Sequence, residues 1–487
     1  MYIGVDLGTS GVKLLLMDRD GRILNKTTIQ YGISFPKPGW SEQDPYDWYD
    51  NTIAGIRELI MDIDPSLVRG IGVGGQMHGL VILDDNDEVI RPAILWNDGR
   101  TAEETDYLNN TIGEDKLAEY TGNIAFAGFT APKILWVYNN EPDNFAKISK
   151  IMLPKDYLVY RLTGAFCTDY SDASGMLLLD VRNKCWSPEM LDICHVTEDM
   201  LPYLHESSDV AGVVKSDIAS ELGLNSDVIV AAGAGDNAAA AIGTGTVGAG
   251  KCNISLGTSG TIFITDSSFA DLKNNAIHSF AHADGGYHIM GCMLSAASCN
   301  KWWMDDIIGD SDYASAQSQV TDEDLGKNSV FFLPYLMGER SPHNDPKVRS
   351  MFIGMSMDTT RTQMMLAVLE GVAYGMRDSL EVARSMGIVV KETCICGGGA
   401  KSLLWRRIIA NVLNIRVKTL INDEGPALGG AILAAVGDGV YDNVIEASEK
   451  IVGFGEVIEP DERIAGRYEE GYAFYKKLYP NIKDLYR

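Results

Sequence analysis

The hexapeptide DLGTSG occupies Asp6–Gly11, and SLGTSG returns at Ser255–Gly260. Each copy lies between apolar, β-rich runs: YIGV and VKLLLMD around the first, KCNI and TIFITD around the second. Each stretch therefore predicts a strand, a tight glycine turn and a returning strand. Because the same hairpin stands near the start of each half, we expect an internal duplication with its boundary between residues 240 and 254.

Length and composition narrow the class of protein. A chain of 487 residues is too long for one hydrophobic core. The net charge of −26 argues against nucleic acid and anionic membranes as partners. Eight cysteines without a CxxC pair indicate reduced thiols, no apolar run approaches the ~18 residues that span a bilayer, and no signal segment is evident. We expect a cytoplasmic protein.

Strand and helix signals alternate along the chain. Asp44 and Pro45 predict the start of a helix over 44–61, and apolar runs on both sides of GQMHG (75–79) predict strands. Residues 361–386 predict a long helix that stops at Gly387. The alternation predicts an α/β protein.

The first glycine turn has the composition of a phosphate-binding loop. Gly8 and Gly11 let backbone N–H groups approach phosphate oxygens, and the hydroxyl groups of Thr9 and Ser10 add further donors. The second turn carries the same residues and can bind phosphate in the same way. The alternative is that both are simply tight hairpin turns.

The residues beside the two turns differ in charge. Asp6 precedes the first turn and is placed to hold Mg²⁺ through water, and Lys13 adds a mobile cation. Ser255 stands at the equivalent position of the second copy and offers no charge to a metal. Two facing turns with one carboxylate would form a clamp for a metal–nucleotide complex.

Three further motifs are candidates for a site. Asp236 follows a predicted strand and starts a predicted helix, a position that suits either a catalytic carboxylate or a helix N-cap. Met77 and His78 lie in a loop between glycines and could form a ligand wall or pack as loop residues. GGGA (397–400) could lie against a nucleotide or form a strand-to-helix turn with positive φ.

Taken together, these motifs resemble the FGGY family of carbohydrate kinases over essentially the whole chain. The matching stretches are MYIGVDLGTSGVK (1–13), WSEQDP (40–45), GQMHG, RPAILWNDGR (91–100), GFTAPKILWV (128–137), LPKDYL (153–158), GDNAA (235–239), SLGTSG, LSAAS (294–298), FLPYLMGERSPHN (332–344), LEGV (369–372) and GGGA.

The resemblance implies two actin-like (ribonuclease H-like) ATPase domains with a ligand cleft between them. Residues 1–245 would bind the sugar and supply the catalytic base, and residues 246–487 would bind ATP. The family also implies a homodimer.

The resemblance further assigns roles to individual residues. Asp236 would be the catalytic base, and Asp6 would serve the phosphates and Mg²⁺. Sugar binding is expected of Met77, His78, Trp96, Asp236 and Asn237, and ATP binding of Gly8, Thr9, Ser10, Lys13, Gly257, Thr258, Gly398, Gly399 and Ala400. Some relatives carry Asn near position 403, where this chain has Leu403, so a side-chain contact to the nucleotide there is in doubt.

The GQMHG stretch narrows the choice of substrate, since glycerol kinases carry charged residues at the Met-His position. The resemblance therefore implies ATP-dependent phosphorylation of D-xylulose at its 5-hydroxyl, in pentose catabolism. Two alternatives remain open. One is the same chemistry on ribulose, gluconate or glycerol, and the other is an actin-like ATPase or scaffold without a small acceptor.

Overall fold

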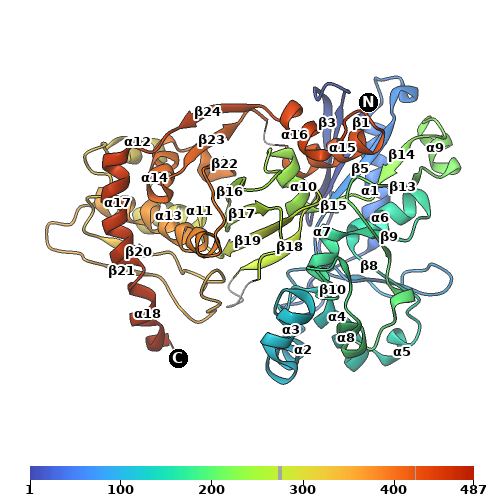
Figure 1. Cartoon of the computed structure of the whole chain (residues 1–487), viewed down its shortest axis with the longest axis horizontal. Helices are drawn as coiled ribbons and strands as arrows, with labels where there is room; N and C mark the ends of the chain where they lie inside the picture. Colours follow the sequence, from blue (N-terminus) through green and yellow to red (C-terminus); the bar gives the residue numbers. More distant parts are fainter. Residues whose placement is uncertain (272–276, 423, 487) are drawn as a thin grey trace.

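The computed structural model describes residues 1–271, 277–422 and 424–486. Two seven-stranded sheets, one from each half of the chain, form the centres of two lobes that lie beside each other (Figure 1). Helices cover both sheets. The division of the chain predicted from the sequence, near residue 245, falls between α10 (Asp236–Gly243) and the first strand of the second sheet.

The first sheet has the strand order β13-β14-β5-β1-β2-β3, with β15 paired to β5. Its strands are β1 (Tyr2–Leu7), β2 (Gly11–Met17), β3 (Ile23–Gln30), β5 (Gly70–Gly75), β13 (Val210–Val213), β14 (Ile229–Ala231) and β15 (Ala234–Gly235). The second sheet has the order β18-β19-β17-β16-β22-β23-β24. Its strands are β16 (Cys252–Leu256), β17 (Gly260–Asp266), β18 (His278–Ala281), β19 (Tyr287–Met293), β22 (Glu392–Cys396), β23 (Arg416–Leu420) and β24 (Phe454–Ile458).

The two sheets repeat one topology. In the first, β1 pairs antiparallel with β2 and parallel with β5; in the second, β16 pairs antiparallel with β17 and parallel with β22. Asp6 lies opposite Lys13 across the first hairpin, and Ser255 lies opposite Thr261 across the second. Both predicted hairpins and the duplication are confirmed. The Asp-to-Ser difference thus falls at equivalent positions of the two sheets.

The two helices whose bounds the sequence predicts are present at those positions. α1 (Pro45–Leu59) has Asp44 as N-cap and Pro45 at its first position, and α13 (Arg361–Ser385) ends just before Gly387. The remaining helices are α2 (Ala102–Asp106), α3 (Glu114–Thr121), α4 (Thr130–Asn140), α5 (Pro142–Phe145), α6 (Pro154–Thr163), α7 (Tyr170–Ala173), α8 (Pro188–Ile193), α9 (Ser216–Leu222), α11 (Ala297–Lys301), α12 (Tyr313–Ser318), α14 (Leu403–Leu413), α15 (Gly425–Gly437), α16 (Val444–Ile451), α17 (Glu462–Tyr475) and α18 (Leu478–Ile482). Within the described ranges, no helix combines the length and apolar character needed to cross a membrane.

Short strands connect these elements outside the two sheets. They are β4 (Glu42–Gln43), β6 (Val81–Leu83), β7 (Ala93–Ile94), β8 (Lys150–Met152), β9 (Cys167–Asp169), β10 (Leu179–Asp180), β11 (Cys185–Trp186), β12 (Tyr203–His205), β20 (Phe331–Leu333) and β21 (Met351–Ile353).

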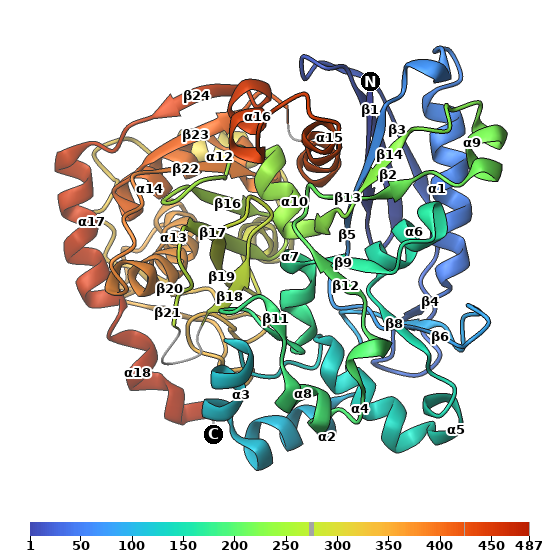
Figure 2. The same ribbon diagram turned by 45° about the vertical axis from the view of Figure 1, so that its right-hand side comes forward.

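Helix α15 belongs to the second half of the sequence but packs on the first sheet, beside β1 and β5 (Figure 2). Glycines make this close approach feasible. A Cβ atom on Gly4 would lie 1.8 Å from the carbonyl oxygen of Ala427, and one on Gly72 would lie 1.9 Å from that of Gly430. The backbone of α15 therefore rests almost directly on β1, which ends at the first glycine turn, and on its neighbour β5.

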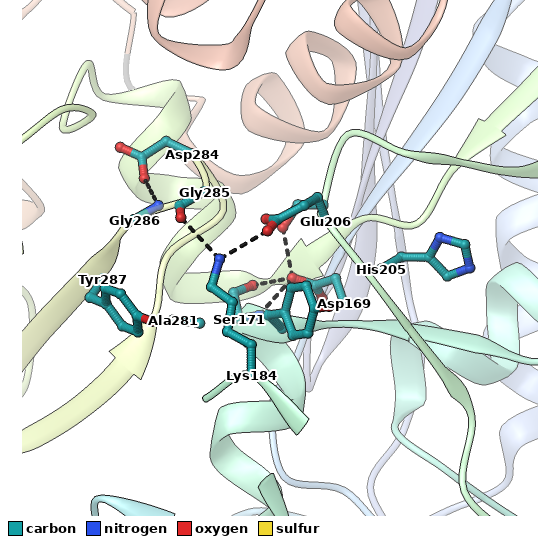
Figure 3. A network of polar contacts seen from close by, with 12 residues as sticks. Asp169, Ser171, Lys184, His205, Glu206, Ala281, Asp284, Gly285, Gly286 and Tyr287 are labelled. Atoms are coloured by element: carbon teal, nitrogen blue, oxygen red, sulfur yellow. Dashed lines mark hydrogen bonds and ion pairs between the residues drawn. The ribbon is translucent and has the colours of Figure 1, made fainter. Parts of the chain in front are cut away.

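The second half also contacts the first through the hairpin of β18 and β19. Asn123 exchanges two hydrogen bonds with the backbone of Ser279, at 2.8 and 3.1 Å. At the hairpin tip, the Lys184 ammonium donates to the carbonyl oxygen of Gly285 at 2.9 Å and pairs with Glu206 at 2.9 Å (Figure 3). The hairpin is thus fixed to the first half by polar contacts at its strand and at its tip.

Candidate active site

Asp236 is the first residue of α10 and directly follows β15, which lies beside β5. Gly235 is the N-cap of this helix, so the N-cap interpretation of Asp236 is wrong. The Asp236 Oδ1 atom is buried and has no hydrogen-bond partner among the described residues. This oxygen can therefore accept a proton from a ligand.

The surroundings of Asp236 raise the pKa of its carboxyl group. Burial raises the pKa of the Asp236 carboxyl to about 7, with a further contribution from the negative charge of Asp6 and an opposing one from the Asn237 backbone N–H. A carboxylate with a pKa near the working pH is suited to general base catalysis, because it is available unprotonated and still attracts a proton.

Asp6 lies at the turn end of β1. Burial raises the pKa of its carboxyl to about 6, and the charge of Lys13 opposes that shift. Two partly buried carboxylates that repel each other, supplied by Asp6 and Asp236, fit a divalent cation with hard oxygen ligands such as Mg²⁺. Asp6 would hold the ion through water, and bound Mg²⁺ would neutralise phosphate charge.

A cavity of about 380 Å³ contains the Asp236 carboxylate and is large enough for a small sugar. The structure brings all five predicted sugar-binding residues to its wall: Met77, His78, Trp96, Asp236 and Asn237. The second half closes the other side with residues that include Ser259, Gly260, Thr261, His278, Phe280, Met290, Cys292, Met293, Leu294 and Arg340. The cavity therefore lies between the two halves.

One ring nitrogen of His78 is hydrogen-bonded within the protein, and the other is left for a ligand. Its backbone is left-handed, with φ of 69°, and Nδ1 lies 2.8 Å from the carbonyl oxygen of Gly175. Burial lowers the pKa of His78 to about 3, with the charge of Lys133 as the next cause, so the ring is neutral. Since a carbonyl can only accept, Nδ1 carries the proton and Nε2 remains an acceptor for a sugar hydroxyl.

Trp96 joins the cavity to the first glycine turn. Its indole Nε1–H donates to the Thr9 hydroxyl at 2.9 Å, and 48% of the side chain is exposed. Met77, in contrast, is buried, and its sulfur accepts a long hydrogen bond of 3.7 Å from the Asn237 amide. Trp96 in the cavity wall is thus bonded to the first glycine turn, and Met77 in the same wall is bonded to Asn237, the residue after Asp236.

A second cavity of about 330 Å³ adjoins the first, and Asn237 and Thr261 line both. Its other lining residues are Lys13, Ala240, Ala241, Thr244, Asn253, Ser255, Phe263, Cys396, Gly397, Glu424, Gly425 and Pro426. Ser255 and Thr261 belong to the hairpin of the second glycine turn. Two neighbouring cavities with a shared wall can hold a phosphate donor and an acceptor next to each other.

The cation predicted to contact phosphate already has a partner. Lys13 forms an ion pair with Glu424 at 2.5 Å, and Lys26 pairs with the same carboxylate at 2.9 Å. Lys13 lines the second cavity, so its ammonium is near the expected nucleotide. Contact with a phosphate would require Lys13 to exchange or share its bond to Glu424.

The second turn packs against the GGGA stretch. Gly397 has φ of 86°, and a Cβ atom there would lie 2.7 Å from the carbonyl oxygen of Leu256, so the requirement for positive φ is confirmed. Gly398, Gly399 and Ala400 follow in a short 3₁₀ helix, and Leu403 begins α14. In the second turn, the Gly257 carbonyl oxygen accepts a hydrogen bond from the N–H of Ala297, the first residue of α11, at 2.9 Å. Contacts of these residues and of Thr258 with ATP remain predictions.

Sequence reasoning missed the cavity residues that the second half supplies. His278, Phe280, Cys292 and Arg340 carry no local motif for ligand binding, and only the fold brings them opposite Asp236. Arg340 lies within the FLPYLMGERSPHN stretch, which carried the family resemblance but suggested no role. The available signal for a binding role was the charged residue itself, which stands shortly after Gly338 and directly before the Ser341-Pro342 pair.

Comparison with known proteins agrees with this geometry. Residues 1–243 match the N-terminal domain, and residues 252–437 the C-terminal domain, of the FGGY family of carbohydrate kinases. The chain belongs to this family, and its fold is the expected pair of actin-like domains.

Individual proteins of the family are similar to this chain over its whole length. The chain is 39% identical to xylulose kinase of Escherichia coli (strain K12), over 100% of both chains. Among solved structures, a xyloylose kinase from Brucella ovis superimposes with a TM-score of 0.94 at 40% identity and 99% coverage of each chain. A gluconate kinase from Lactobacillus acidophilus also reaches a TM-score of 0.94, at 25% identity, covering 100% of this chain and 98% of its own.

Proposed function

We propose that this chain is a cytoplasmic xylulose kinase, which transfers the γ-phosphoryl group of ATP to the 5-hydroxyl of D-xylulose. The observation that carries the proposal is the position of Asp236, which lies in a sugar-sized cavity that shares Asn237 and Thr261 with a second cavity. Full-length likeness to the Escherichia coli enzyme supports D-xylulose as the acceptor.

The residues divide the reaction among them. The Asp236 carboxylate accepts the proton of the 5-hydroxyl while that oxygen forms its bond to the γ-phosphorus, and the bond between the γ-phosphorus and the ADP oxygen breaks. Phosphoryl transfer asks the protein chiefly for positioning and charge stabilisation. His78 Nε2 and the Asn237 amide would orient the sugar, and the two glycine turns would hold the phosphates.

The test is an ADP-release assay with D-xylulose, D-ribulose, L-ribulose, L-xylulose, gluconate and glycerol. We expect D-xylulose to give the highest kcat/KM. A different preferred sugar would replace the substrate but keep the kinase, whereas ATP hydrolysis without any response to sugar would contradict both. Light scattering during gel filtration would test the proposed homodimer.

The pH dependence should report the base. Because burial and the charge of Asp6 raise the pKa of Asp236 to about 7, protonation removes the base below that pH. We expect kcat/KM for D-xylulose to fall about tenfold for each pH unit below 7, measured at subsaturating ATP. A rate that stays constant down to pH 5 would contradict the assignment of the base.

A further inference from the structure

Side chains of the first half hold the carbonyl oxygens of the first glycine turn. The Tyr31 hydroxyl donates to the carbonyl oxygen of Gly8 at 2.5 Å, and the Gln43 amide donates to that of Thr9 at 2.6 Å. The Gln76 amide adds a longer bond to the Gly8 oxygen, at 3.5 Å. Two successive carbonyl oxygens of the turn are thus bound by side-chain donors.

The neighbours of the Gln43 amide fix its orientation. Its oxygen accepts from the indole N–H of Trp48 at 3.0 Å, a group that can only donate. Its nitrogen donates to the carbonyl oxygens of Thr9 and Gly32, at 2.6 and 3.0 Å, and these can only accept. A flipped amide would place donor against donor and acceptor against acceptor. Gln43 and Trp48 are both buried, so water does not replace these partners.

A held carbonyl oxygen also sets the direction of the N–H group that follows it. In a planar trans peptide, the C=O and the next N–H point in opposite directions. The bonds to Gly8 and Thr9 therefore turn the N–H groups of Thr9 and Ser10 away from the side chains that hold the turn. Neither N–H has a hydrogen-bond acceptor within the described part of the chain, and Ser10 is exposed. Successive free N–H groups of this kind can bind an anion.

The second glycine turn has the same arrangement but different partners. The carbonyl oxygens of Gly257 and Thr258 accept from the backbone N–H groups of Ala297 and Ala296, both at 2.9 Å. The N–H groups of Thr258 and Ser259 again have no acceptor among the residues that the structure describes. These are the positions equivalent to those of the first turn. Since the two halves reach one arrangement through unrelated contacts, the peptide orientation is the feature that both turns share.

Both turns adjoin the cavity that contains Asp236. Ser259 of the second turn lines this cavity, and Trp96 in its wall donates to the Thr9 hydroxyl of the first turn at 2.9 Å. Lys13, two residues after the first turn, lines the neighbouring cavity. The free N–H groups of both turns are therefore at the border of the proposed reaction site.

We propose that Gln43 and Tyr31 are positioning residues for phosphoryl transfer, because they hold the first turn so that the N–H groups of Thr9 and Ser10 can donate to phosphate oxygens of ATP. The inference rests on the proposed function, since it takes ATP as the ligand. Neither side chain has to touch the nucleotide. Donors that are oriented before the ligand binds stabilise its charge without any reorganisation of the peptides.

The test measures the affinities for Mg-ATP and for adenosine by titration calorimetry, without sugar. Gln43→Met keeps the approximate size of the side chain and removes the amide, whereas Tyr31→Phe removes only the hydroxyl. Since a hydrogen bond to a charged group is lost or weakened, the Kd for Mg-ATP should rise about 10–100-fold in Gln43→Met and about 3–10-fold in Tyr31→Phe. The Kd for adenosine, which has no phosphate, should stay unchanged. A cleft that is merely distorted would weaken both ligands.

Asn411→Leu is the matched control for the loss of a buried amide. Asn411 lies in the second half, where its amide donates to the carbonyl oxygen of Arg407 and accepts from the N–H of Asp461, both at 2.8 Å. This change should lower the melting temperature and leave the Kd for Mg-ATP unchanged. If Gln43→Met does not fold, Tyr31→Phe decides, because it leaves the bonds of Gln43 in place.

The outcomes separate the two proposals. If the Tyr31 and Gln43 variants bind Mg-ATP like the wild type, or lose ATP and adenosine equally, the positioning role is overturned and the kinase remains. If the wild type binds Mg-ATP but releases no ADP with any sugar, the proposed function is overturned alone. A wild type that does not bind Mg-ATP would overturn both.

Discussion

Replacing Asp236 by Asn is expected to lower kcat for D-xylulose by about 10²–10⁴-fold, the range that general base catalysis contributes. Asn has nearly the same shape as Asp but cannot accept the proton of the 5-hydroxyl. The cavity wall would be preserved, so the affinities for sugar and ATP should change by only a few-fold. Fixed-time ADP assays would give kcat. Intrinsic tryptophan fluorescence, to which Trp96 in the cavity wall contributes, would follow sugar binding.

Protein stability separates this chemical effect from a folding defect. A carboxyl whose pKa is raised by folding destabilises the native state above its unfolded pKa, because the unfolded chain releases the proton more readily. Asn removes this cost, so the melting temperature of Asp236→Asn at pH 8 should equal or exceed that of the wild type. Asp217→Asn, an exposed change of the same charge in α9, should keep full activity. Near-normal kcat in Asp236→Asn would contradict the assignment of the base.

The sequence predicted the parts of the fold that local patterns encode. Glycine turns between apolar runs predict hairpins, and Asp44 with Pro45 predicts a helix start, because these signals act within a few residues. Asp236 was located by the same logic, at a strand-to-helix junction. The sequence left its role open. Gly235 is the N-cap of α10, which excludes capping by Asp236, and the cavity around its unpartnered oxygen favours catalysis.

Contacts between distant segments could not be predicted in this way. The pairing of Lys13 with Glu424 joins residues from opposite ends of the chain, and the packing of α15 on the first sheet depends on glycines in both elements. Arg340 likewise reaches the cavity only because its loop joins the edge of β19. These contacts depend on how the chain is folded, and no local spacing of residues in the sequence predicts them.

A buried charge cluster contacts the backbone segment that leads to Asp236. Lys155 is fully buried and pairs with Asp156 at 2.7 Å and with Asp169 at 3.2 Å, and its ammonium also donates to the carbonyl oxygen of Ala232 at 3.0 Å. Asp169 accepts from the Ser171 hydroxyl (Figure 3). Lys155 therefore binds the backbone a few residues before Asp236.

The cluster contains more carboxyl groups than cations. Burial first, and then the charges of Asp156, Asp169 and Asp236, hold the pKa of Asp172 well above its usual range, with Lys155 opposing. For Lys155, burial would lower the pKa, but the neighbouring carboxylates outweigh it and the pKa is raised. Lys155 is the cation on which the ionised members depend.

Replacing Lys155 by Met is therefore expected to destabilise the protein by about 3–5 kcal/mol near pH 7.5, the usual cost of leaving a buried charge without its partner. Urea unfolding followed by circular dichroism would measure the loss. Without the cation, the folded-state pKa values of the carboxyls rise above their unfolded values, so stability should fall as pH increases. The deficit relative to the wild type should thus be smaller at pH 5.5 than at pH 8.

Lys133→Met is the matched control, because Lys133 is equally buried but its partners in the described ranges are the carbonyl oxygens of His78 and Gly128, at 2.7 and 2.6 Å. Burial holds the pKa of Lys133 well below its usual value, and among the described residues no carboxylate forms an ion pair with its terminal nitrogen. Its loss should cost about 1–3 kcal/mol. Equal losses for the two variants, or a Lys155→Met deficit that ignores pH, would show that the carboxyl groups do not need the Lys155 cation.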